Sequence, residues 1–299
     1  MLSLSKLVAI VVSTLTVGSS QADLYAIRFG STSALFRMDE TTGVSERVGT
    51  VNIAAACGLD FGPDGMLYTF TRDEKVVYRI DPATSIATAV GPLGVDFDLE
   101  GGIYVVSETE AYAVVGIRGD DFVPRESKIL SIDLTTGAAT EIWRFPRGDL
   151  SGITMRSDGK LVVYGAVATY SLYLIDLDTR SIQPFGPQFI GSGEIAGLTS
   201  DGEIAYLLLD GVLVRTNLFT GVTSAVSAAV RPNITGLAMG NPVCVADCDG
   251  SGQLDPNDID CFVAGFLAGD ALSADCDGNG SLNFDDIDCF VAGFLAGCP

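Results

Sequence analysis

Histidine is absent from all 299 residues of this chain, and basic residues are scarce. The absence of histidine excludes Ser-His-Asp and Cys-His nucleophile systems and removes the commonest zinc ligand. Lys and Arg number 17 against 38 Asp and Glu, which gives a net charge of −21. Because nucleic acid binding needs clustered positive charge, nucleic acid is not an expected partner.

Hydrophobic runs long enough to cross a membrane are also missing. Lys6 precedes an apolar run of 11 residues, Leu7 to Val17, which leads into the small-x-small sequence Ser20-Gln21-Ala22. This run is too short to span a bilayer and is typical of an export signal, so residues 1–22 are predicted to be removed. An uncleaved membrane anchor is the alternative. We therefore expect a secreted protein, extracellular or attached to a cell surface, with no transmembrane segment in the mature chain.

The most informative stretch is a tandem repeat near the C-terminus. Residues 247–269 and 275–297 agree at 18 of 23 aligned positions. Each copy opens with oxygen-bearing residues at positions 1, 3, 5, 7, 9 and 12 and a glycine at position 6, the pattern of a calcium loop. An apolar helical pattern follows each loop, from Ile259 to Leu267 and from Ile287 to Leu295, and predicts a helix that buries one apolar stripe. No helix is expected before either loop. We predict two calcium ions, with the ligands Asp247, Asp249, Ser251, Gln253, Asp255 and Asp258 in the first loop and Asp275, Asp277, Asn279, Ser281, Asn283 and Asp286 in the second.

Six of the seven cysteines flank or lie within these repeats. Export makes disulfides plausible, and six cysteines allow 15 connectivities. The pairing that respects the repeat is Cys248–Cys261, Cys276–Cys289 and Cys244–Cys298, and crossed pairing between the copies is the alternative. The seventh cysteine, Cys57, is expected to be a buried, inert thiol.

Duplicated loop-helix calcium units at a C-terminus resemble the dockerin family, and the cysteines with the Gly-Cys-Pro ending are similar to its GC-type variant. The resemblance covers residues 241–299 and implies that this small α domain attaches the chain to a cohesin-like protein or another surface receptor. Many dockerins have small hydroxyl residues at loop positions 10 and 11. This chain instead has Pro256, Asn257, Phe284 and Asp285.

Residues 23–240 carry a second repeat, which predicts an all-β fold. A turn of the form Asp/Asn-x-x-Thr/Ser-Gly, or a near relative, recurs at spacings of 41 to 52 residues, and apolar alternating runs flank each copy. The turns begin at Asp39, Asp81, Asp133, Asp176 and Asn217. A strand starting with glycine and an apolar residue also recurs, at Gly58, Gly94, Gly152, Gly197 and Gly236, and Tyr68, Tyr104, Tyr164 and Tyr206 mark the strands after the first four.

Four strands in about 43 residues is the period of a β-propeller blade. The pattern resembles propellers of the NHL, sugar-lactonase and WD40 kinds, in which the glycine strand is innermost. Because the chain begins on a second strand and ends on an inner strand, Ile234 to Met239, we expect the last strand to complete the first blade. Five blades are predicted. Six is the alternative, because the segment from Glu108 to Glu126 is unusually long.

The propeller sequence offers few residues for chemistry. Asp60, Asp96, Asp98 and Glu194 are candidates for a cation or sugar site at the channel, or for turn capping. Trp143, Phe145 and Arg147 are candidates for a sugar platform or for packing between blades. The favoured function is a ligand- or protein-binding propeller displayed through the calcium-dependent tail. The alternative is a carbohydrate-active hydrolase or lyase, in which Asp60 and Asp96 would be the two carboxylates that glycoside hydrolysis requires.

Overall fold

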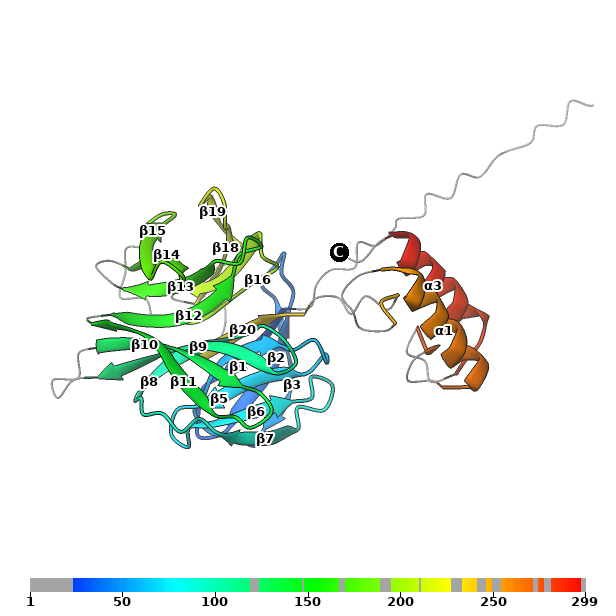
Figure 1. Cartoon of the computed structure of the whole chain (residues 1–299), viewed down its shortest axis with the longest axis horizontal. Helices are drawn as coiled ribbons and strands as arrows, with labels where there is room; N and C mark the ends of the chain where they lie inside the picture. The colour runs from blue at the N-terminus through cyan, green and yellow to red at the C-terminus, as the bar shows by residue number, and fades with distance from the viewer. Residues whose placement is uncertain are drawn as a thin grey trace, which may run out of the picture.

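The computed structural model describes residues 24–118, 124–146, 148–166, 170–188, 195–209, 211–226, 233–240, 246–248, 254–270, 274–276 and 281–296. Within these ranges the strands form five antiparallel four-stranded sheets, the blades of a β-propeller (Figure 1). The five-bladed prediction is confirmed and the six-bladed alternative is wrong. The unusually long segment is the extended hairpin of β9 and β10, which belongs to the third blade.

From the inner to the outer strand, each blade follows one order. The first is β20 (Ile234–Met239), β1 (Leu24–Arg28), β2 (Ser33–Met38) and β3 (Ser45–Val51). The second is β4 (Ala56–Phe61), β5 (Leu67–Thr71), β6 (Val76–Ile80) and β7 (Ala87–Pro92). The third is β8 (Leu99–Val105), β9 (Glu110–Arg118), β10 (Pro124–Asp133) and β11 (Ala139–Pro146). The fourth is β12 (Asp149–Met155), β13 (Leu161–Ala166), β14 (Tyr170–Asp176) and β15 (Ser181–Phe185). The fifth is β16 (Ile195–Ser200), β17 (Ile204–Leu209), β18 (Val212–Asn217) and β19 (Thr223–Ala225).

The ring closes as predicted, because β20 pairs with β1 from the other end of the propeller sequence. The inner strands β4, β8, β12, β16 and β20 contact one another in this order around the centre, and β20 contacts β4. Closure of this kind leaves no inner-strand edge for another chain to pair with.

Glycines allow the inner strands to approach so closely. A Cβ atom added to Gly102 would lie 2.8 Å from the backbone nitrogen of Ile153 in the next blade, and one added to Gly236 would lie 2.6 Å from that of Leu59. Such distances are too short for a real side chain, so only glycine fits. The equivalent positions form a ring of Gly58, Gly102, Gly152, Gly197 and Gly236.

This ring corrects one sequence prediction. Gly94 does not start the third inner strand, since it lies on the connection between β7 and β8, and Gly102 takes the place in the ring. The register of the third blade therefore shifts by eight residues. Tyr104 lies on the inner strand itself and pairs with Tyr112, which is the tyrosine of the second strand.

The recurrent turns join the third and fourth strands of every blade. In each, the first side chain accepts hydrogen bonds from backbone N–H groups two or three residues ahead, for example Asp39 Oδ1 from Thr42 at 2.8 Å and Asn217 Oδ1 from Thr220 at 2.8 Å. Hydrogen bonds from the turn lower the pKa of Asp39 to about 2. The fifth turn residue has a positive φ, which explains why it is usually glycine.

The C-terminal region contains helices α1 (Pro256–Ala268) and α3 (Phe284–Ala296), which lie side by side in Figure 1. Phe262 and Phe290, at equivalent positions of the repeat, stack with ring centroids 4.2 Å apart. The predicted helices are present, and Gly269 ends α1 at a φ of 72°. Ala274, directly before the second loop, is helical, so the expectation of no helix there fails at this described residue.

Only the inner part of each predicted apolar stripe is buried. Phe262 and Phe290 are 4% exposed, whereas Val263 is 46% and Leu267 is 81% exposed. The expectation that the whole stripe is buried is therefore wrong. A unit this small buries only a modest fraction of its surface, so much of each apolar stripe stays exposed.

Candidate functional site

The two predicted carboxylates of the propeller lie far apart. Asp60 is near the end of β4, next to the β4–β5 turn, and its Oδ2 accepts a hydrogen bond of 2.7 Å from the backbone N–H of Val105. Asp96 lies on the β7–β8 connection, where it is 92% exposed and 2.5 Å from Lys75 Nζ. Because Lys75 is on the β5–β6 turn, Asp96 belongs to the opposite end of the blade. The structure does not bring these two carboxylates together as a catalytic pair.

Asp60 has a structural role that the fifth blade assigns to a threonine. The side chain of Thr199, at the equivalent place on β16, accepts a 2.9 Å hydrogen bond from the backbone N–H of Met239 in the next blade. Asp60 does the same toward Val105 of the third blade. Burial raises the pKa of the Asp60 carboxyl to about 7, although backbone hydrogen bonds oppose this shift. These contacts favour the interpretation of Asp60 as a link between blades.

The other described candidates of the propeller also make contacts that suit a structural role. Asp98 accepts a 2.6 Å hydrogen bond from the backbone N–H of Arg118, as a loop-capping residue would. Trp143 is partly buried and packs on Phe145 at 4.1 Å, within the apolar cluster between the third and fourth blades, which favours blade packing over a sugar platform. Glu194 and Arg147 lie outside the described residues. Cys57 is a buried free thiol, as predicted, and burial raises its pKa to about 12.

Charged residues do gather at the propeller end where the inner strands begin. Arg72 on the β5–β6 turn lies 2.8 Å from Glu100 on β8 and stacks over the ring of Phe29 at 4.8 Å. The start of β12 contributes Asp149, whose Oδ2 is 3.4 Å from the hydroxyl of Tyr170. Together with Arg118 at the end of β9, these residues form what we name the mouth cluster: Phe29, Arg72, Glu100, Arg118, Asp149 and Tyr170.

Electrostatics distinguish Asp149 within the mouth cluster. Its pKa is raised, first by burial and then by the negative charge of Glu100, while the Tyr170 hydroxyl and the charge of Arg118 act in the opposite direction. A partly buried carboxyl whose pKa is raised by burial and by the charge of a second carboxylate is a functional-site candidate. Sequence reasoning missed Glu100 because the wrong glycine was assigned to the third inner strand, and it missed Asp149 because no local pattern indicates that this residue is buried.

The second candidate site lies in the C-terminal repeats. Of the twelve predicted calcium ligands, the structure describes Asp247, Asp255, Asp258, Asp275, Ser281, Asn283 and Asp286. The other five, Asp249, Ser251, Gln253, Asp277 and Asn279, lie outside the described residues.

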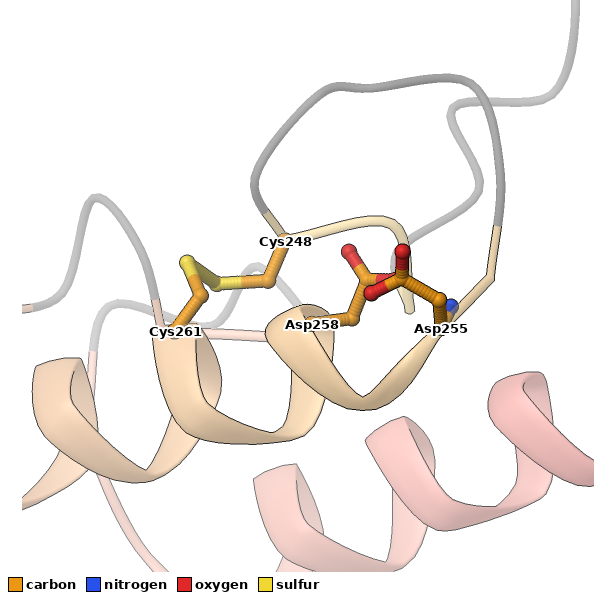
Figure 2. Close-up of a disulfide and its surroundings, with 4 residues drawn as sticks. All are labelled: Cys248, Asp255, Asp258 and Cys261. Atoms are coloured by element: carbon orange, nitrogen blue, oxygen red, sulfur yellow. A yellow bond between two sulfur atoms is a disulfide. The ribbon is translucent and has the colours of Figure 1, made fainter.

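The loop-closing residues Asp258 and Asp286 are completely buried, with 0% of their surface exposed. Asp258 Oδ2 accepts a 2.8 Å hydrogen bond from the backbone N–H of Asp255, the N-cap of α1, and Asp286 Oδ2 accepts one of 2.7 Å from Asn283. The two repeats therefore hold these carboxylates in the same way, inside the first turn of each helix. Figure 2 shows the carboxylates of Asp255 and Asp258 side by side.

Two disulfides connect the loops to the helices. Cys248 is bonded to Cys261 and Cys276 to Cys289, with Cα–Cα distances of 5.8 and 5.9 Å. These are the two pairings within single copies that the sequence favoured, whereas Cys244 and Cys298 lie outside the described residues. Each copy therefore forms its own cross-link.

No family model matches the chain, and no curated protein matches its sequence. Among solved structures, it is similar to TolB from Acinetobacter baumannii, with 15% identity and a TM-score of 0.46 over 68% of this chain and 52% of that one. It is also similar to a chain of a nidogen/laminin complex, with 12% identity and a TM-score of 0.47 over 73% of this chain and 98% of that one.

This chain thus spans about half the length of the TolB chain. At such low identity and TM-scores, neither likeness says anything about ligands, and the five-bladed assignment rests on the sheets themselves. Within the described residues, no helix is long and apolar enough to cross a membrane.

Proposed function

We propose that this protein is a secreted bacterial binding propeller, held at a scaffold or cell surface by a C-terminal region that binds two calcium ions. The observation that carries the calcium proposal is the complete burial of two equivalent carboxylates, Asp258 and Asp286, at the predicted loop-closing positions.

The physical reason for proposing a bound cation is the negative charge of these buried carboxylates. A buried carboxylate needs compensation, because removing an ionised group from water costs several kcal/mol or more. Backbone hydrogen bonds supply part of it, but no Lys or Arg occurs between Cys244 and Pro299, where 11 acidic residues lie. A divalent cation supplies the rest. The ligand set of carboxylate, amide and hydroxyl oxygens suits calcium, which prefers hard oxygen ligands.

Isothermal titration of the chelator-treated, disulfide-intact full chain with calcium tests this proposal. We expect two bound ions in the natural chain and one in either single variant, Asp258→Asn or Asp286→Asn. Asp260→Asn and Asp288→Asn are matched controls, since they remove the same charge from exposed positions two residues along each helix. If the natural chain gave no calcium heat, or if the buried and exposed variants bound equally, the ligand assignment would be wrong.

The exposed apolar residues of the helices support the docking proposal. Ile259, Val263 and Leu267 follow one another at intervals of four along α1, and Val291 and Leu295 occupy equivalent places on α3. Large apolar residues exposed in a row often mark protein-interaction sites. A cohesin-like receptor is the partner that the dockerin resemblance implies.

Docking is measured by biolayer interferometry against a panel of purified cohesin domains, with and without calcium. We expect calcium-dependent binding that the double variant Leu267→Asp, Leu295→Asp removes. Binding that is independent of calcium, or unaffected in this variant, would exclude the helices as the docking surface.

For the propeller, we infer that ligands bind at the mouth cluster, with polysaccharide as the first class to screen. Arg72→Ala should abolish retention on a polysaccharide that the natural chain retains. Arg79→Ala is the matched control, because Arg79 lies on the same blade and pairs with Asp64 at 2.8 Å near the opposite end. Equal retention of both variants would place the ligand elsewhere.

Hydrolysis is the second candidate function, and one observation favours it. Asp149, whose pKa is raised by burial and by the charge of Glu100, has the character of a general acid. Release of reducing sugar that disappears in Asp149→Asn would support an enzyme, whereas retention without release supports a binding module.

A further inference from the structure

The disulfides of the C-terminal region lie at the two ends of the predicted calcium loops. Cys248 directly follows Asp247, the first ligand, and Cys261 lies three residues after Asp258, the last. The second copy repeats this arrangement, with Cys276 after Asp275 and Cys289 after Asp286. Figure 2 shows the Cys248–Cys261 bond on the same side of α1 as the carboxylates of Asp255 and Asp258.

In a paired EF-hand, a helix enters the loop and a second helix leaves it, and together they hold the loop ends in place. This chain has no room for a full entering helix between its two copies. Gly269 ends α1, and the five residues 270–274 supply little more than one helical turn before Asp275. Another element must hold the beginning of the loop against the leaving helix.

We infer that each disulfide replaces the entering helix: it clamps the first ligand residue of its loop to the leaving helix and thereby sets the affinity for calcium. The inference rests on the proposed calcium binding and adds a covalent determinant, and hence redox control, to that site. Each disulfide acts on its own loop, because each joins residues of one copy only.

The size of the effect follows from chain entropy. Closing a loop of about 15 residues by a disulfide removes about 3 kcal/mol of conformational freedom, which corresponds to about 100-fold in an equilibrium constant. Without the disulfide, metal binding has to overcome this cost itself. Some order remains from the buried carboxylate and the stacked Phe262 and Phe290, so we expect calcium affinity to fall about 10- to 100-fold.

The test is calcium titration of the full chain carrying Cys276→Ala and Cys289→Ala, alone and in the Asp258→Asn background. The Asp258→Asn variant isolates the second loop, so its remaining site should weaken about 10- to 100-fold when the cysteines are removed. In the Asp286→Asn background, which isolates the first loop, the same cysteine variant should bind calcium with unchanged affinity. Circular dichroism at saturating calcium checks that α3 still forms.

Reduction of the natural chain provides a second measurement. A dithiol such as dithiothreitol gives two electrons and two protons to each disulfide, which opens to two thiols while the dithiol closes to its own cyclic disulfide. Both sites should weaken together, and reoxidation should restore them. Cys57 does not interfere, because this thiol is buried in the propeller.

The outcomes separate the two proposals. No calcium binding to the oxidised natural chain overturns the calcium proposal itself. Two intact sites whose affinities do not change on cysteine removal and reduction overturn only the clamp. Loss of both sites when one copy loses its cysteines, or failure of α3 to form at saturating calcium, also overturns it, since the disulfide would then support the fold of the region and not its own loop.

Discussion

Replacing Asp60 with asparagine should make the propeller more stable above neutral pH and leave it almost unchanged near pH 4. The amide oxygen of asparagine can still accept the hydrogen bond from the Val105 N–H group, so the link between the second and third blades remains. Only the negative charge is removed.

The magnitude comes from the pKa of Asp60, which burial raises from 3.8 to about 7 in the folded protein. A carboxyl with a raised pKa binds its proton more tightly in the folded state, so its contribution is fully favourable below pH 4. That contribution declines as the pH rises through 7 and is constant above it. A shift of about three pH units corresponds to at most about 4 kcal/mol, and we expect about 1–3 kcal/mol because part of the side chain contacts water.

Urea unfolding followed by tryptophan fluorescence measures this difference. Trp143 is the only tryptophan and lies on β11, so its signal reports the propeller and not the C-terminal helices. The free energy of unfolding of the variant should exceed that of the natural chain at pH 8 and converge with it at pH 4. The opposite slope, or a constant difference across this range, would refute the account of Asp60 as a buried carboxyl that favours its protonated form.

Two further predictions concern one substitution that removes a glycine and one that introduces a glycine. Gly102→Ala should destabilise the propeller by about 2 kcal/mol or more, because the added Cβ would overlap the backbone of Ile153. A lower melting temperature of the variant would confirm this prediction. An unchanged melting temperature would mean that the inner strands can separate. Arg180→Gly should stabilise the propeller by about 1 kcal/mol, because Arg180 has a φ of 49° that glycine adopts without strain. A lower free energy of unfolding in urea for this variant would contradict the prediction.

Much of the propeller could be predicted because its signals are local. The turn that begins at Asp39 or Asn217 depends on hydrogen bonds between residues two or three apart, so five such turns imply five blades whatever their surroundings. The first-blade closure likewise followed from the order of strand types. In the repeats, the apolar pattern from Ile259 to Leu267 indicated α1 for the same reason.

Longer-range features could not be predicted from these patterns. Gly94 and Gly102 are both followed by apolar residues, and only contact with Gly152 of the next blade identifies Gly102 as the inner-strand residue. The mouth cluster joins residues from β8, β9, β12, β14 and two connections, which no single stretch of sequence brings together. The burial of Phe262 and the exposure of Val263 depend on where the second helix packs.

The sequence by itself determined the number of blades, the closing strand, the two helices and the two disulfides within single copies, because each of these depends on interactions within a few residues or on repetition. Only the tertiary structure decided that Asp60 and Asp96 lie at opposite ends of a blade, that the charge of Glu100 acts on Asp149, and that Asp258 and Asp286 are buried. Burial and charge proximity arise from elements distant in the sequence, and these two quantities determine where carboxylates can bind a cation or a ligand.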